Sequence, residues 1–290
     1  MKKKTIRYLI FVFAIAWIIQ AVVAVLSGKG NAAAGGALLS LSMCVPMLSV
    51  LLSGNSLKEM GWKPQIRKNI RQYIIAWFAP AALTAIGAAL YFLVFPGHFD
   101  LGGQAMAASA GEEALEQLAA QGITYPMYIM IAIIEALTFA PFVNMLFALG
   151  EEIGWRGYLY PQLKAEFGRN KGRILGGIIW GVWHWPLIWL IGYEYGTDYI
   201  GFPVVGMLLF LIITVAWGTL HDWLYEKSGS IWVPALLHGA LNAAAGIPLL
   251  VCVTDIGSAR LLGPAPVGIL AAVPFILIAG AVMRRQKDRD

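Results

Sequence analysis

The stretch PMYIMIAIIEALTFAPFVNMLFALGEEIGWR, residues 126–156, joins a long apolar run to a cluster of charges. About 20 consecutive apolar residues let a helix cross the hydrocarbon core of a bilayer, so residues 126–150 predict a membrane-spanning helix. Two carboxylates and a guanidinium follow at once, as Glu151, Glu152 and Arg156. Because an ionised group costs about 2.5–3.5 kcal/mol at the centre of such a helix, charges placed here indicate either a partner or a function.

The composition of the whole chain is that of an integral membrane protein. Of its 290 residues, 59% are hydrophobic and only 13% are charged, whereas soluble domains carry about 25% charged residues. The net charge of +5 does not indicate a nucleic-acid partner, since the basic residues follow membrane topology. Cys44 and Cys252 lie far apart in apolar segments, and they form neither a disulfide framework nor a metal motif.

Seven further apolar runs predict an all-α fold, a bundle of eight transmembrane helices that makes residues 1–290 a single membrane domain. The eight predicted spans are 6–26, 36–53, 73–95, 126–150, 174–192, 200–221, 231–252 and 265–283. Between the third and the fourth, residues 105–118 are rich in Ala, Glu and Leu and predict a short surface helix.

The positions of Lys and Arg test this count, because cytoplasmic loops of membrane proteins collect basic residues. With the N-terminus in the cytoplasm, 19 of the 21 basic residues fall in predicted cytoplasmic segments, and only Lys29 and Arg260 fall on the other side. The outer segment 97–125 holds four acidic residues and no basic one. This distribution predicts a multi-pass protein of the cell membrane with both termini in the cytoplasm.

Glu151 and Glu152 cannot share one direction on a helix, because neighbouring residues point about 100° apart. Glu152 and Arg156 have the i, i+4 spacing that favours an acid preceding a base. We therefore expect Glu152 to pair with Arg156, and Glu151 to face the interior of the bundle. From this stretch alone, an ordinary salt bridge at a helix end is an equally good interpretation.

Two histidine clusters lie in later spans. The first is WGVWHWP, residues 180–186, which places His184 inside the fifth span next to a proline that should kink the helix. The second is PALLHGALN, residues 234–242, where His238 and Asn242 project from one helix face. Ionisable groups inside a membrane span indicate function by default, although each cluster also suits a polar contact that holds helices together.

Under the predicted topology, the three clusters can converge in the cytoplasmic half of the bilayer. Glu151 ends a span at the cytoplasmic side, and the spans of His184 and His238 start there. A carboxylate and an imidazole can activate water, and an imidazole and an amide can donate hydrogen bonds to an oxyanion. This equipment hydrolyses an amide without a Ser or Cys nucleophile, so we expect an endopeptidase that cuts a peptide bond near the cytoplasmic leaflet.

The ordered motifs EExxxR, WxxxH and HxxxN resemble those of the CAAX-protease and bacteriocin-processing (CPBP, or Abi) family of intramembrane glutamic endopeptidases. They occupy about residues 126–250, which is the expected catalytic core. The WHWP sequence around His184 and the expected lack of an extra domain are more similar to bacterial members than to eukaryotic prenyl-protein proteases. The family usually begins the second motif with Phe, where this chain has Trp180.

This resemblance implies roles for the residues that match the motifs. Glu151 and His184 would activate the attacking water, and His238 and Asn242 would stabilise the tetrahedral oxyanion. The supporting residues would be Glu152, Arg156 and Trp180.

The resemblance also implies hydrolysis without a cofactor. A catalytic zinc ion is the alternative, since two His and one Glu match a known ligand set, and its ligands would be Glu151, His184 and His238. The chain lacks the HExxH motif of many zinc proteases. The expected partners are the lipid bilayer and a peptide or membrane-associated protein substrate, either a prenylated C-terminal peptide or a small secreted peptide.

Two other functions compete with proteolysis. The chain could be a non-catalytic membrane regulator or immunity protein that acts by protein–protein interaction. A transporter is the other alternative, and the lack of inverted repeats argues against it. Three further ionisable residues have other interpretations: His221 and Asp222 suit a cap at the membrane interface, and Glu135 suits either the lining of the cavity or a contact with another helix.

Overall fold

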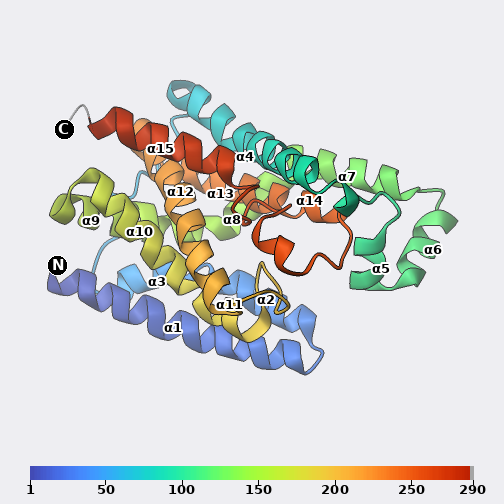
Figure 1. Ribbon diagram of the computed structural model, residues 1–290. Coiled ribbons are helices and arrows are strands. Elements are labelled where there is room, and N and C mark those ends of the chain that lie inside the picture. Colours follow the sequence, from blue (N-terminus) through green and yellow to red (C-terminus); the bar gives the residue numbers. More distant parts are fainter. Residues whose placement is uncertain (288–290) are drawn as a thin grey trace.

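Five helices are long and apolar enough to cross a membrane in the computed structural model, which describes residues 1–287 (Figure 1). They are Lys3–Gly28 (α1), Ile66–Val94 (α4), Arg169–Ile191 (α10 and α11), Val204–Ser228 (α12) and Trp232–Leu250 (α13 and α14). Two bent pairs raise the number to seven if each pair is one span: Ala32–Ser42 with Val45–Leu52 (α2 and α3, 44°), and Glu112–Ala120 with Tyr125–Leu137 (α6 and α7, 89°). The chain is therefore an all-helical, multi-pass membrane protein, as predicted, whereas eight spans and cytoplasmic termini stay predictions.

Prolines lie beside the breaks in four of the predicted spans, and two of these breaks adjoin the site. The span predicted over 126–150 consists of α7, which ends at Leu137, and of Ala140–Glu152 (α8). Pro141 has no amide hydrogen to bond to the carbonyl of Leu137, so a new helix starts there. In the same way α10 ends at Trp183 and α11 starts at Trp185, beside Pro186. The helix is thus interrupted at His184, although residues Arg169–Ile191 still form one candidate span.

Several predicted helix boundaries are wrong; α12, for example, ends seven residues beyond the predicted 221. The last helix, Val273–Lys287 (α15), starts eight residues later than predicted, and residues 265–272 form turns instead. The surrounding sequence GPAPVG, residues 263–268, is too rich in Gly and Pro for a helix. The predicted surface helix 105–118 is divided into Gln104–Ala110 (α5) and α6 by Gly111, whose φ of 86° breaks the helix.

Short elements complete the described chain. They are the 3-10 turns Pro96–His98 (η1) and Gly257–Leu261 (η3), the π-helix Ile153–Leu159 (η2), and the helix Tyr160–Phe167 (α9); within the paired spans, α10 is Arg169–Trp183, α11 is Trp185–Ile191, α13 is Trp232–Ala245 and α14 is Ile247–Leu250.

Hydrogen bonds sort the connecting segments into two ends of the bundle. At one end, which we call the basic end, Lys4 donates to the carbonyl of Gly54, the Ile231 amide donates to that of Gly61, and Asn170 donates to that of Met283. The N-terminus, the end of α15 and α9 lie there, and α5 and α6 lie at the opposite end (Figure 1). The 19 basic residues assigned to one side by sequence thus belong to segments that meet in space, except that Arg289 lies outside the described residues.

At the opposite end, which we call the acidic end, the loops that follow α4 and α14 meet. The Asp100 amide donates to the carbonyl of Val251, and the Val253 amide donates to that of His98, both within 3.0 Å. The loop between α11 and α12 joins them, since the Ile200 amide donates to Ser258 Oγ. The structure therefore supports the grouping of loops that the charge pattern predicts.

Close helix packing positions the polar clusters. Gly239 of α13 lies so close to α8 that a Cβ added to it would be 2.3 Å from the Pro141 carbonyl oxygen. Gly154 lies against α3 in the same manner, with an added Cβ 2.3 Å from Pro46 Cβ. These contacts bring the end of α8 next to the histidine on α13, and only glycine fits at either position.

Candidate active site

Glu151 is buried in the last turn of α8 and is held by two indole groups. Trp155 Nε1 donates to its Oε2 over 3.0 Å, and Trp180 Nε1 donates to the same oxygen over 2.8 Å. No residue of the described chain bonds to Oε1 of Glu151, and this side chain lines an internal cavity of about 410 Å³. Glu151 thus presents a fixed carboxylate with one oxygen left for another group.

His184 lines the same cavity from the break between α10 and α11. Its Nδ1 lies 2.9 Å from the carbonyl oxygen of Trp180. A carbonyl can only accept, so Nδ1 carries the hydrogen and Nε2 is left with a free lone pair. The neighbouring Trp183 and Tyr193 rings enclose the imidazole, with Tyr193 stacked on it at 6.0 Å between ring centroids. His184 is therefore oriented as a proton acceptor.

Glu152 faces away from the cavity, into a fully buried ion pair. Its Oε1 accepts from Arg156 Nη1 and from His238 Nδ1, each over 2.8 Å. The contact predicted between Glu152 and Arg156 is present, and the guanidinium also lies over the Trp180 ring, 4.4 Å from its centroid. The two adjacent glutamates thus have different surroundings: Glu151 lines the cavity, and Glu152 supports His238.

His238 and Asn242 line the cavity from one face of α13. Because Nδ1 of His238 donates to Glu152, its Nε2 is the ring atom available to the cavity. Asn242 lies one turn further along, and its side chain is exposed. The four residues predicted to carry the chemistry, Glu151, His184, His238 and Asn242, therefore surround one cavity.

Comparison with known proteins gives matches over the part of the chain that carries these four residues. Residues 133–244 match the family described as type II CAAX prenyl endopeptidase Rce1-like. This part of the chain is thus similar to the CAAX-protease family. A relative named CAAX prenyl protease 2, from Methanococcus maripaludis, is 31% identical over 102 residues, which is 35% of this chain and 37% of that relative. The chain thus matches just over a third of the relative's length, and the resemblance named from the sequence motifs is confirmed.

Trp180 contacts residues of all three sequence motifs. Its ring lies 5.4 Å from that of His238, 5.7 Å from that of His221 and 6.3 Å from that of His184, between centroids. Its indole nitrogen also donates to Glu151. A Phe, which the CAAX-protease family usually has here, would keep the ring contacts and lose this hydrogen bond.

His221 is a member of the cluster that sequence reasoning assigned wrongly. It is buried because α12 continues for two more turns to Ser228, so the residue is not an interfacial cap. Its Nδ1 lies 2.7 Å from the Trp217 carbonyl oxygen, and its Nε2 has no partner among the described residues. Asp222 is buried as well and accepts from Arg173 and Lys164.

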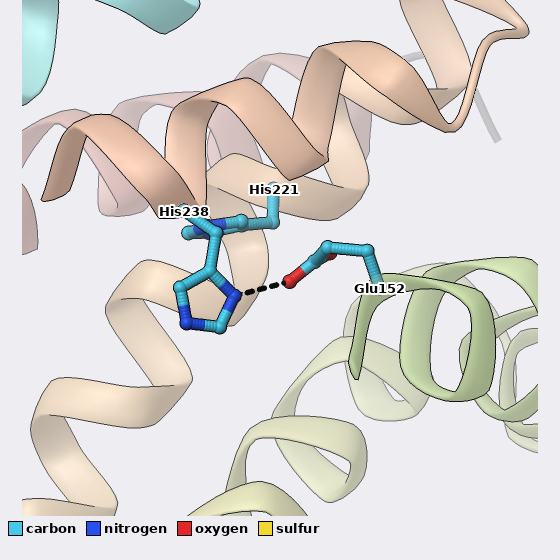
Figure 2. A group of neighbouring side chains, drawn as sticks. All are labelled: Glu152, His221 and His238. Atoms are coloured by element: carbon cyan, nitrogen blue, oxygen red, sulfur yellow. Dashed lines mark hydrogen bonds and ion pairs between the residues drawn. The ribbon is translucent and has the colours of Figure 1, made fainter. Parts of the chain in front are cut away.

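Glu152, His221 and His238 offer ligand atoms within 4.8 Å of one another, and Figure 2 shows their side chains grouped between α8, α12 and α13. This set shares only His238 with the zinc ligands suggested by the sequence. Oε1 of Glu152 already accepts two hydrogen bonds, and the guanidinium of Arg156 adds a positive charge beside it. The arrangement suits a buried hydrogen-bond network better than a cation site.

Among the cavity-lining residues that sequence reasoning missed are Asn144, Tyr193 and Glu194. Asn144 lies two turns before Glu151 on α8, so helical spacing could have identified it. Glu194 lies in the loop after α11, where no motif marks it. The Glu194 side chain is exposed to the cavity and has protein on its other sides. This enclosure raises the pKa of its carboxyl, and a hydrogen bond from Tyr193 partly opposes the rise. Glu135, by contrast, lies exposed on α7 away from the cavity.

Replacement of Trp180 by Phe should lower kcat/KM for peptide cleavage by about tenfold while the protein stays folded. A hydrogen bond to a charged group contributes about 1.5–3 kcal/mol, and the Trp155 indole still holds Glu151. The measurement is the initial rate of cleavage by purified protein in detergent. Trp185→Phe is the matched control, because its ring nitrogen has no partner in the described chain, and it should keep the wild-type rate.

Proposed function

We propose that this chain is an intramembrane endopeptidase that uses a glutamate and a histidine to activate water. The observation that supports it best is the shared cavity, into which Glu151, His184, His238 and Asn242 project from three separate helical segments. Their hydrogen bonds leave the atoms that the reaction needs unpaired, namely Glu151 Oε1 and His184 Nε2.

In the proposed reaction, Glu151 takes a proton from a water molecule placed between it and His184. The water oxygen attacks the carbonyl carbon of the scissile bond, and a tetrahedral oxyanion forms. The intermediate collapses as the C–N bond breaks, and the proton returns to the leaving nitrogen through His184 or Glu151. The two products are a new carboxylate and a new amine, so the reaction consumes one water and no cofactor. General acid–base catalysis of this kind supplies about 10²–10⁴-fold.

His238 and Asn242 would supply the hydrogen bonds to the oxyanion. With Nδ1 of His238 donating to Glu152, a hydrogen on Nε2 makes the ring a cation. The buried carboxylate of Glu152 balances that charge, which explains why a second glutamate lies behind the histidine. Asn242 offers its amide hydrogens from one turn away and needs no change of charge.

The match to a prenyl protease over a third of its length leaves two substrate classes to distinguish, a prenylated C-terminal peptide and a small secreted peptide. The test uses the purified chain in proteoliposomes with a farnesylated peptide that ends in a CAAX sequence, the same peptide without the lipid, and a mixture of secreted-peptide precursors. Mass spectrometry identifies the cut bond. Cleavage that continues after exhaustive chelation supports the metal-free mechanism, and cleavage restored only by added zinc contradicts it.

The competing function, a regulator that acts by binding, predicts no cleavage by the wild-type chain in this assay. It also predicts that a Glu151→Gln and His184→Ala double variant keeps full biological activity in a complementation assay. Loss of complementation by a folded double variant supports the endopeptidase.

Replacement of Asn242 by Ala should lower kcat by about 10²–10³-fold with little change in KM, because an oxyanion donor acts mainly in the transition state. The side chain is exposed to the cavity and has no hydrogen-bond partner in the described chain, so the fold should tolerate the change. Ala245→Ser, one turn further along the cavity wall, is the control and should stay within a few-fold of wild type. An unchanged kcat for Asn242→Ala would remove Asn242 from the proposed oxyanion site.

A further inference from the structure

The first helix, α1, buries one row of side chains against the rest of the bundle, and that row contains a glutamine. The buried positions are Thr5, Tyr8, Val12, Ala16, Gln20 and Val23. Other positions of α1 are exposed, as at Ile18, which has 67% of its surface accessible. Gln20 itself has no exposed surface, so its amide lies where a polar group without a partner costs free energy.

The Gln20 side chain donates a hydrogen bond to the break between α10 and α11. Its Nε2 lies 2.9 Å from the carbonyl oxygen of Trp183, the last residue of α10. This contact is possible because α1 packs against α11 (Figure 1). It joins α1 to the residue that precedes His184, one of the four residues predicted to carry the chemistry. α1 lies outside residues 133–244, so the family match assigns no role to Gln20.

The Trp183 carbonyl is available because the hydrogen bonds of the helix shorten at His184. In a regular α-helix each amide donates to the carbonyl four residues earlier. Here the His184 amide donates to Gly181 and the Leu187 amide donates to His184, each three residues earlier and over 3.0 Å. The carbonyls of Trp180 and Trp183 are therefore released from the amides that would ordinarily bond to them.

Side chains occupy both released carbonyls. That of Trp180 accepts from Nδ1 of His184 over 2.9 Å, which leaves the lone pair of the ring on Nε2. That of Trp183 accepts from Gln20. With an apolar residue in place of Gln20, the Leu187 amide would be the donor that regular helix geometry returns to Trp183. The His184 amide would then return to the Trp180 carbonyl and compete there with the His184 ring.

We propose that Gln20 is a positioning residue of this site, which stabilises the helix break that orients His184. The inference rests on the proposed endopeptidase function, in which His184 takes part in proton transfer. Oε1 of Gln20 has no partner among the described residues, so this side chain buries an unpaired acceptor. An apolar residue would pack here without that cost, which indicates that the amide serves the break and not the packing of α1.

NMR of the chain with ¹⁵N in its histidine rings tests this inference without any need for cleavage. The chain has four histidines, and a His184→Ala variant identifies the signals of His184. Neutral His184 should carry its hydrogen on Nδ1 in the wild type. Gln20→Met, which keeps the length of the side chain and removes the donor, should move part of the population to the tautomer with the hydrogen on Nε2. An unchanged tautomer in this variant overturns the proposal.

Thr5→Val is the matched control for both measurements. It removes another buried polar contact of α1, in which Thr5 Oγ1 lies 3.5 Å from Tyr158 Oη, at the opposite end of the helix. The His184 signals should stay as in the wild type. Gln20→Asn, whose amide is one methylene too short to reach Trp183, should behave like Gln20→Met and replaces it if the apolar variant does not fold.

Cleavage kinetics connect the helix break to the reaction. Gln20→Met should lower kcat by about 10–100-fold with KM within a few-fold of wild type, because a displaced proton acceptor slows the chemical step. Its midpoint of thermal unfolding should fall no further than that of Thr5→Val, since polar contacts between membrane helices contribute little to stability on average.

Two kinetic results overturn the proposal. One is a wild-type kcat for Gln20→Met, and the other is an equal loss of kcat in Thr5→Val, which would mean that α1 only holds the bundle together. A change of the His184 tautomer in Gln20→Met, in a protein whose wild-type form cleaves no peptide, would instead contradict the endopeptidase function alone. The two failures are therefore distinguishable.

Discussion

Glu151→Gln should lower the rate of peptide cleavage by about 10³-fold or more, because glutamine cannot take a proton from water. The fold should survive, since the amide has the shape of the carboxylate and its oxygen can still accept from Trp155 and Trp180. The measurement is single-turnover cleavage by purified protein in detergent, with the melting temperature recorded for each variant.

Glu135→Gln is the matched control for this change. Glu135 lies on the helix that precedes α8, is exposed and does not line the cavity, so its variant should cleave at the wild-type rate. Full activity of a folded Glu151→Gln variant would contradict the proposed mechanism. If the Glu152→Gln variant instead lost cleavage activity while its KM and stability stayed unchanged, Glu152 would be the base.

The parts of the site that depend on local spacing could be predicted from the sequence. A separation of four residues on a helix fixes which side chains are neighbours, so the pairing of Glu152 with Arg156 and the common face of His238 and Asn242 follow from the sequence. The multi-pass helical architecture follows in the same manner from the length of the apolar runs, since the bilayer sets that length; the eight predicted spans compare with five to seven candidate spans in the structure.

The parts that depend on contacts between distant segments could not be predicted. Nothing in the sequence near His221 shows that its ring lies 5.5 Å from that of His238, because this contact depends on the packing of α12 against α13. The stacking of Tyr193 on His184 depends likewise on a loop of irregular conformation, in which Glu194 has a φ of 66°.

The division of work between the two glutamates has a physical basis in these contacts. A carboxylate that acts as a base needs an oxygen in contact with water, and Glu151 lines the cavity. A carboxylate that balances the charge of a histidine and an arginine is most effective where no water screens it, and Glu152 has no exposed surface. Adjacent positions on one helix turn provide both environments, because their side chains diverge by about 100°.

Arg156→Met should destabilise the protein by about 3–5 kcal/mol, because it leaves the buried carboxylate of Glu152 without its cation. Both side chains of this pair have zero exposure, so water cannot replace the lost contact. The expected result is a lower midpoint of thermal unfolding in detergent, followed by tryptophan fluorescence. Arg284→Met, at an exposed position of α15, is the matched control and should leave the midpoint nearly unchanged.

A Glu152→Met and Arg156→Met double variant separates stability from activity. Replacing both partners of a buried pair by apolar side chains is often neutral or stabilising, so the double variant should regain most of the midpoint lost by Arg156→Met. It should nevertheless cleave at least tenfold more slowly than wild type, because Nδ1 of His238 has lost its acceptor and the ring its counter-charge. Recovery of both properties together would mean that Glu152 and Arg156 only hold the helices in place, and that His238 needs no carboxylate behind it.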